Sequence, residues 1–154
     1  MAEVIDNEGS FYTANLRSAK ATDYLILKDE SEVVYEPNFT FHGFRYVHLQ
    51  GLRNPLSKDD LTGLAIHSPM RETGHFECSD SLLDRLQKNI EWGQRDNFLD
   101  VPTDCPQRDE RLGWTGDAQV FSMTAAYNFD VATFYTKWLN DLAADQLEDG
   151  RYPL

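Results

Sequence analysis

Residues 72–81 read ETGHFECSDS, and the hydrophobic pattern of the chain changes at this stretch. Upstream, between residues 11 and 67, short runs of β-branched and aromatic residues alternate with turn formers, which is typical of an all-β module. Downstream, apolar residues recur at the spacing of amphipathic helices. We therefore predict an α+β fold in which a β-rich module at residues 1–75 precedes a helical part at residues 76–154.

The β-rich part contains several candidate strands, which read FYTANLRSA, DYLILK, EVVYEP, FTFHGFRYVHLQG and LTGLAIHS. Apolar side chains alternate onto both faces of residues 44–49, which predicts a strand covered on both sides. His42 and His48 are expected to be packed or hydrogen-bonded rather than metal ligands, because no acidic or cysteine residue lies at ligand spacing.

Three helices are predicted downstream. The first follows a cap at Ser79 or Ser81 and runs to about Asn97, the second begins near Asp117, and the third follows Asp130 as its cap. Each has an apolar stripe. The stripes are Leu82, Leu83, Leu86 and Ile90; then Val120, Phe121, Thr124 and Tyr127; then Val131, Phe134, Trp138, Leu139 and Leu142.

Composition excludes several classes of partner. The net charge of −12 and the isoelectric point near 4.6 repel phosphate backbones and anionic membrane surfaces. No apolar run reaches the roughly 18 residues of a membrane span, and residues 1–16 lack signal-peptide features, so we favour a cytoplasmic location. Reduced thiols are the default expectation for Cys78 and Cys105, and a single disulfide bridge is the alternative. No cofactor is expected.

The segment between the first two predicted helices is a long loop, because Pro102 and Pro106 prevent a helix across residues 101–106. Residues 104–117 read DCPQRDERLGWTGD. In the simplest interpretation, its charged residues pair at the surface and Trp114 fills the core. Alternatively, Trp114 between two glycines is a platform for a sugar ring, and the charged side chains bind its hydroxyls. The residue types alone leave both interpretations open.

The acidic residues of this loop also suit glycoside hydrolysis. One carboxyl group must stay protonated to donate to the leaving oxygen, and a second must stay ionised. The candidates are Asp104, Asp109, Glu110 and Asp117, and their residue types do not rank them. A calcium site is disfavoured, because the spacing does not match an EF-hand and Arg108 and Arg111 oppose a dication. We therefore expect no metal.

The stretch PTDCPQRDERLGWTGDAQ at residues 102–119 resembles the signature of bacterial α-L-rhamnosidases, glycoside hydrolase family 78. Other segments resemble the same family and occur in the same order. Upstream of the loop they read FTFHGFRYVHLQG, TGHFECSD and NIEWGQRDNFLDVPTD, and downstream they read AAYNFD and KWLNDLAADQ. The resemblance covers nearly the whole chain, and the loop is its most specific part.

The resemblance implies β-sandwich-like strands followed by the first helices of an (α/α)₆ barrel. It implies an inverting hydrolase that releases L-rhamnose from a glycoside or polysaccharide. By position, Glu110 is the general acid. Asp109 and Arg111 have no catalytic role in the motif, and we interpret them as an ion pair that supports the loop. The implied sugar-binding residues are Asp104, Arg108, Trp114 and Asp117.

One departure from the family pattern is that the general base is expected beyond Leu154. We therefore interpret the chain as an internal fragment that holds half of an active site. Two alternatives remain. A carbohydrate-binding module would place its affinity in the β-rich part, and an (α/α)₆ glycosidase of other sugar specificity would share the barrel, since fold alone does not settle function. The sequence does not indicate the linkage, the aglycone or the oligomeric state.

Overall fold

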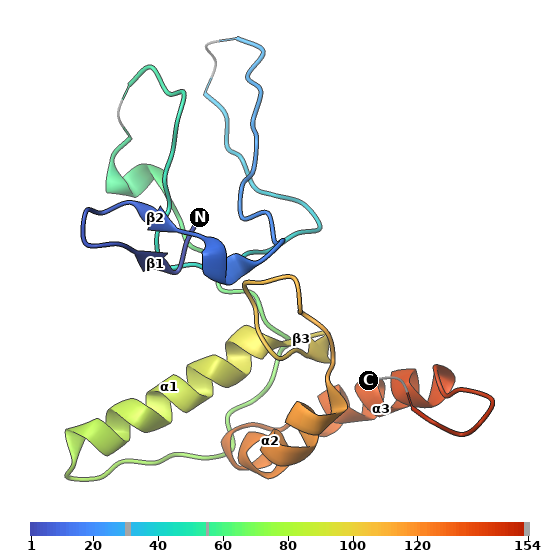
Figure 1. Ribbon diagram of the computed structural model, residues 1–154. Coiled ribbons are helices and arrows are strands. Elements are labelled where there is room, and N and C mark those ends of the chain that lie inside the picture. The colour runs from blue at the N-terminus through green and yellow to red at the C-terminus, as the bar shows by residue number, and fades with distance from the viewer. Residues whose placement is uncertain (30–31, 55, 153–154) are drawn as a thin grey trace. The chain divides into compact units, whose positions relative to one another are not determined.

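The computed structural model describes residues 1–29, 32–54 and 56–152 (Figure 1). By its internal contacts the chain divides into two compact units. Unit 1 holds residues 1–64 together with 106–109, and unit 2 holds residues 65–105 together with 110–154. The fold is mixed α+β, as predicted, with small two-stranded sheets and three helices in the described residues. The predicted boundary between residues 75 and 76 stays a prediction.

Unit 1 begins with a short antiparallel hairpin. Strand β1 (Val4–Ile5) pairs with β2 (Phe11–Tyr12), in the register Val4↔Tyr12 and Ile5↔Phe11. Asp6 shapes the turn, because its Oδ1 accepts hydrogen bonds from the backbone N–H groups of Glu8 and Ser10. A 3₁₀ turn at Ala14–Leu16 follows, and a second lies at Lys58–Asp60.

The prediction of strands throughout residues 11–67 is wrong for most of the described residues. Residues 44–49 are not a strand covered on both sides: Tyr46 forms an isolated bridge with Ala2, and Phe44 and Val47 are each 43% exposed. Ile26 and Val34, in two other candidate strands, are each 93% exposed. β-branched and aromatic side chains fit a pleated, half-buried surface, but a segment rich in them forms a strand only beside a hydrogen-bonded partner strand. The described part of unit 1 supplies few such partners.

Unit 2 contains the three predicted helices, α1 (Ser81–Asn97), α2 (Thr115–Asn128) and α3 (Ala132–Ala144). Their starts differ slightly from prediction. The cap of α1 is Asp80, between the two predicted serines, and its side chain accepts from the N–H of Leu82. Asp130 lies one position before the N-cap of α3, and its Oδ1 accepts from the N–H of Ala132. No helix in the described residues is long and apolar enough to cross a membrane.

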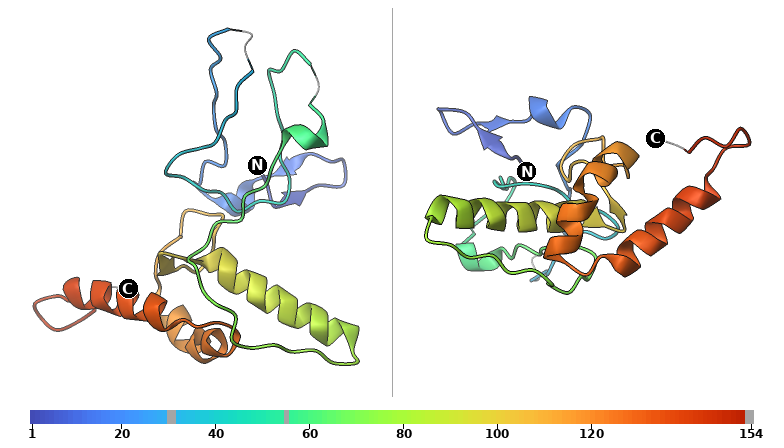
Figure 2. Two further views of the ribbon diagram at one scale, coloured as in Figure 1. Left: turned by 180° about the vertical axis from the view of Figure 1, so that it is seen from behind. Right: turned by 90° about the horizontal axis from the view of Figure 1, so that it is seen from below.

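An extended segment leads into α1. It passes the end of α2, where Glu72 and Phe129 form a β-bridge, and then turns into the first turn of α1 (Figure 2). The N–H groups of Thr73 and Gly74 both donate to the carbonyl of Asn128. Arg95 of α1 pairs with Glu72, and its guanidinium lies over the ring of Phe129. These contacts hold α1 and the α2–α3 connection together.

The core of unit 2 is an aromatic cluster around Phe98, the first residue of strand β3 (Phe98–Leu99). Strand β3 pairs with β4 (Val101–Pro102) in an antiparallel hairpin. The ring of Phe98 stacks on Phe134 at 4.5 Å between centroids, and Phe121 and Tyr135 contact it edge-on. The hairpin is thereby fixed against α2 and α3.

The predicted apolar stripes are only partly buried. Phe134 and Trp138 of α3 are buried, and so is its N-cap residue Val131. On α1, Leu82, Leu83 and Leu86 are exposed, and the helix buries Gln94 instead. On α2, Val120 and Tyr127 are exposed, whereas Ala118, Ala125 and Asn128 are buried. The reason is that α1 and α2 meet through amide side chains, so their most apolar faces point elsewhere.

That amide contact is a buried chain of hydrogen bonds. Gln94 donates to the carbonyl of Ala125 at 3.3 Å, Asn128 donates to Gln94 Oε1 at 3.3 Å, and Gln87 donates to Asn128 Oδ1 at 2.9 Å. Buried polar groups are tolerated when they are hydrogen-bonded. Periodicity of apolar residues does not reveal this interface.

Candidate active site

The loop that carries the motif starts from the β3–β4 hairpin. The hairpin turns at Asp100, which has a φ of 67°. The backbone N–H of Asp100 donates to Ser68 Oγ at 2.9 Å, and Lys137 Nζ lies 2.8 Å from Asp100 Oδ1. Thr103 then donates its N–H and its hydroxyl to the carbonyl of Asn97, at 2.9 and 3.0 Å. The residue before Asp104 is therefore fixed to the end of α1.

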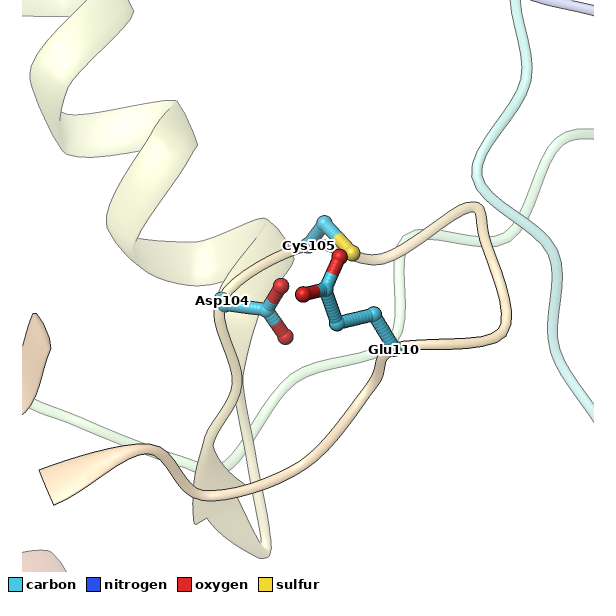
Figure 3. A group of neighbouring side chains, drawn as sticks. All are labelled: Asp104, Cys105 and Glu110. Carbon is cyan, nitrogen blue, oxygen red and sulfur yellow. The ribbon is translucent and has the colours of Figure 1, made fainter. Parts of the chain in front are cut away.

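Two of the predicted site residues lie side by side. Figure 3 shows the carboxyl groups of Asp104 and Glu110 facing one another, with the thiol of Cys105 next to them. One carboxylate oxygen of each acid and the Cys105 Sγ all lie within 4.8 Å of one another. Both acids are half-buried, and Cys105 is only 6% exposed. Cys105 was not predicted to be a site residue, and its buried position within the motif is visible only in the structure.

This geometry limits the chemistry of the two acids. An inverting pair of carboxyl groups needs a separation of roughly 6.5 to 9.5 Å to leave room for water. Asp104 approaches Glu110 more closely than that, so it suits hydrogen bonding to a ligand rather than the role of the inverting base. The three donor atoms are also close enough to hold one cation, but carboxylate oxygen and thiolate sulfur suit different metals.

Trp114 fixes the backbone of Glu110. Its indole Nε1 donates to the main-chain carbonyl of Glu110 at 3.3 Å, and the N–H of Leu112 donates to the same oxygen at 2.6 Å. Trp114 is half-buried and is the N-cap residue of α2, where its own carbonyl accepts from Ala118. The tryptophan therefore joins the predicted acid to the start of a helix, a role that the sequence did not indicate.

The loop returns against α3 at Gly113. A Cβ at this position would lie 2.9 Å from Nε1 of the buried Trp138, so only glycine fits without a shift. Asp117 lies exposed in the first turn of α2, where the positive end of the helix favours a carboxylate. Arg111 is half-buried. The structure thus brings Asp104, Glu110 and Trp114 together and leaves Asp117 on the helix surface.

Arg108 and Asp109 belong to unit 1 by their contacts. Arg108 is half-buried, and Asp109 is exposed. Asp109 Oδ2 accepts from the N–H of Ser18 at 3.3 Å and also from its hydroxyl. The hydroxyl bond lowers the pKa of Asp109 below its ordinary 3.8, and the nearby charge of Arg17 lowers it further. The ion pair between Asp109 and Arg111 stays a prediction, and Ser18 was not foreseen.

Comparison with known proteins gives a consistent result for both parts of the chain. Residues 71–154 match the family described as the bacterial alpha-L-rhamnosidase six-hairpin glycosidase domain. Residues 1–67 match the bacterial alpha-L-rhamnosidase concanavalin-like domain.

Individual relatives carry the same name. The chain is 54% identical to an alpha-L-rhamnosidase of Streptomyces avermitilis over 98% of its own length and 15% of that protein. It is 48% identical to one of Formosa agariphila over 99% of its length and 17% of that protein. The chain therefore spans about a sixth of the length of these curated relatives.

Solved structures agree with these matches. The chain superposes on the alpha-L-rhamnosidase from Dictyoglumus thermophilum with a TM-score of 0.94 and 44% identity, covering 98% of this chain and 17% of that one. It superposes on the Streptomyces avermitilis enzyme, solved in complex with L-rhamnose, with a TM-score of 0.92, covering 98% and 15%. The match across residues 71–154 takes in more than half of the chain, which therefore belongs to the bacterial α-L-rhamnosidase family.

Proposed function

We propose that this chain is the part of an α-L-rhamnosidase that contributes the general acid and sugar-binding loop of an inverting glycoside hydrolase, which releases L-rhamnose from α-L-rhamnosides. The observation that supports this most is the facing pair of Asp104 and Glu110, with the backbone of Glu110 anchored by Trp114. The relatives named alpha-L-rhamnosidase, one of them solved with L-rhamnose, indicate the sugar. In the complete enzyme, α1, α2 and α3 belong to an (α/α)₆ barrel.

Glu110 donates the proton to the glycosidic oxygen as the bond to the leaving group breaks. General acid catalysis requires that the carboxyl group be held within hydrogen-bond reach of that oxygen. The two N–H groups on the Glu110 carbonyl fix its backbone for this purpose. The thiol of the buried Cys105 and the carboxyl group of Asp104 lie next to the Glu110 carboxyl group, within 4.8 Å.

The sugar is held by polar groups around an aromatic ring. Asp104 accepts hydrogen bonds from rhamnose hydroxyls, and Arg108 donates to them. Trp114 offers the half-buried ring that covers the apolar side of the sugar, and Asp117 extends the polar rim. The family's general base is a separate carboxylate, because Asp104 lies too near Glu110 to activate a water on the opposite face of the sugar.

The test is Glu110→Gln in the complete enzyme, assayed on aryl rhamnosides with good and poor leaving groups. A good leaving group departs with little acid assistance, so kcat falls by orders of magnitude on the poor substrate and much less on the good one. Glu148→Gln, at an exposed position of the same unit, is the matched control. An equal loss on both substrates contradicts the role of Glu110. Hydrolysis of another aryl glycoside but not of rhamnosides would favour a different sugar specificity.

A further inference from the structure

The tip of the motif loop, residues 106–109, is part of unit 1. Residues 106–109 have their contacts in unit 1, whereas Cys105 and Glu110 on either side have theirs in unit 2. The chain therefore leaves unit 2 directly after Cys105 and returns to it at Glu110. Whatever fixes residues 106–109 acts one peptide bond away from the predicted acid. Contacts at Ser18 and at Gly43 contribute to this.

Ser18 is presented by an unusual turn. The N–H of Ala19 donates to the carbonyl of Leu16 at 3.0 Å, and Arg17 between them has a φ of 55° and a ψ of −120°. This conformation is the first central position of a type II′ turn and is normally occupied by glycine. Side chains at such angles cost about 1 to 3 kcal/mol and persist when the surroundings determine them. The turn directs both the N–H and the hydroxyl of Ser18 at Asp109 Oδ2.

Gly43 contacts the same loop tip through its lack of a side chain. A Cβ at residue 43 would lie 2.8 Å from the Cβ of Gln107 and 3.1 Å from its Cα and its backbone N. The requirement is for space, since φ at Gly43 is not positive. The neighbouring His42 is itself fixed, because its Nε2 lies 3.1 Å from Asp23 Oδ1. Within unit 1, the backbone at Gly43 is therefore packed directly against Gln107 of the loop tip.

We propose that Ser18 and Gly43 are positioning residues for the reaction, because they hold residues 106–109 and so set where Glu110 and Arg108 act. This inference rests on the proposed function. Consecutive Cα atoms are about 3.8 Å apart and cannot separate, so a shift of Asp109 moves the backbone of Glu110. Misplacement of a reacting group by about 1 Å can cost about a hundredfold in rate. Ser18 and Gly43 thus act on the reaction through the loop residues that they hold.

The test compares Ser18→Ala and Gly43→Ala in the complete enzyme with matched controls. Ser10→Ala is the serine control, because the hydrogen bonds recorded for Ser10 are made by its backbone. Gly63→Ala is the glycine control, because a Cβ there meets nothing within 4 Å. Ser18→Thr retains a hydroxyl and should restore most of the lost rate.

The first readout is kcat on aryl rhamnosides with poor and good leaving groups. A displaced acid lowers kcat about tenfold or more on the poor substrate and little on the good one. If Ser18 and Gly43 only stabilised the fold, the fraction of active enzyme would fall and both substrates would lose rate equally. An equal loss, or no loss, overturns the inference.

The second readout does not depend on activity. Backbone amide exchange of residues 107–112 should accelerate in Ser18→Ala and Gly43→Ala but not in the two controls. Unchanged exchange overturns the inference, whatever the enzyme hydrolyses. If the unaltered enzyme cleaves no rhamnoside, the proposed function fails, and accelerated exchange would then still support the anchoring of the loop by Ser18 and Gly43.

Discussion

Glu110 is restrained through both its backbone and its surroundings. Its carbonyl accepts from Leu112 and Trp114, and its side chain faces Asp104 and Cys105. The motif predicted which residue types gather in this loop. It did not predict which of them touch, because the contacts depend on how the loop reverses between Pro106 and Gly113. Ser18 and Gly43 were missed for the same reason: they are distant in sequence and carry no chemistry that marks them.

Trp114→Ala and Asp104→Asn should each weaken inhibition by free L-rhamnose in the complete enzyme by about tenfold, or ~1.4 kcal/mol. The first removes the apolar ring, and the second keeps the shape of the side chain but removes its charge. Glu148→Gln, which removes a charge at an exposed position, is the matched control. Inhibition constants measured on one aryl rhamnoside check this. Unchanged inhibition constants in both site variants would favour the simpler interpretation, in which the loop is a surface turn that binds no sugar.

The contact between Asp109 and Ser18 should depend on pH. The hydroxyl of Ser18 lowers the pKa of Asp109 below 3.8 in the folded state. A depressed pKa stabilises the fold above 3.8, and this contribution is lost as pH falls through the lower folded pKa. Asp109→Asn should therefore be less stable than the natural sequence near neutral pH, and the difference should shrink below pH 3.8. Denaturant unfolding of the complete enzyme across this range checks it, and a difference that grows on acidification would contradict it.

At the scale of elements, helices were predictable and strands were not. Helices α1, α2 and α3 depend on local periodicity and capping, so their positions were predicted to within a few residues. Strands need partners that are remote in sequence, and segments such as residues 22–28 have no partner strand among the described residues. The contact between α1 and α2 was not predictable from apolar periodicity, because Gln94 and Asn128 pair with each other there and the leucines of α1 take no part.

The return of the loop onto α3 should be sensitive to one methyl group. In Gly113→Ala the new Cβ meets the indole nitrogen of Trp138 at 2.9 Å, so the loop or the tryptophan must shift. Overpacking of this kind typically costs about 1 to 3 kcal/mol. Gly116→Ala is the matched control, because its Cβ meets nothing within 4 Å and alanine favours the first turn of α2. Thermal melts of the complete enzyme should show a loss for Gly113→Ala alone, and equal melts would contradict this packing.

For the whole molecule, the outstanding feature is exposed apolar surface on both units. Leu82 is 77% exposed, Val120 is 86% exposed and Ile26 is 93% exposed. These residues lie on regular faces or runs rather than scattered singly, which marks surfaces that other structure covers. The chain also spans only 15% to 17% of the length of its curated relatives named above. We expect the remainder of such an enzyme to cover these faces and to supply the base opposite Glu110.

The 154-residue chain alone should therefore be weakly stable and inactive. Each Å² of apolar surface left in water loses about 25 cal/mol of stabilising free energy. Several exposed leucine, valine and aromatic side chains therefore lose several kcal/mol together. That amount is comparable with the roughly 5 to 15 kcal/mol that stabilises a typical domain. The isolated chain should melt broadly, bind the dye ANS through its exposed faces and hydrolyse aryl rhamnosides at the background rate. The complete enzyme should melt sharply and hydrolyse them.

Replacing both Leu82 and Val120 with glutamate should reduce dye binding by the isolated chain. The same replacement should destabilise the complete enzyme, because these positions are expected to be covered in the complete enzyme alone. A sharp melt with robust hydrolysis by the chain alone would contradict the argument and require a base among Asp104, Asp109 and Asp117.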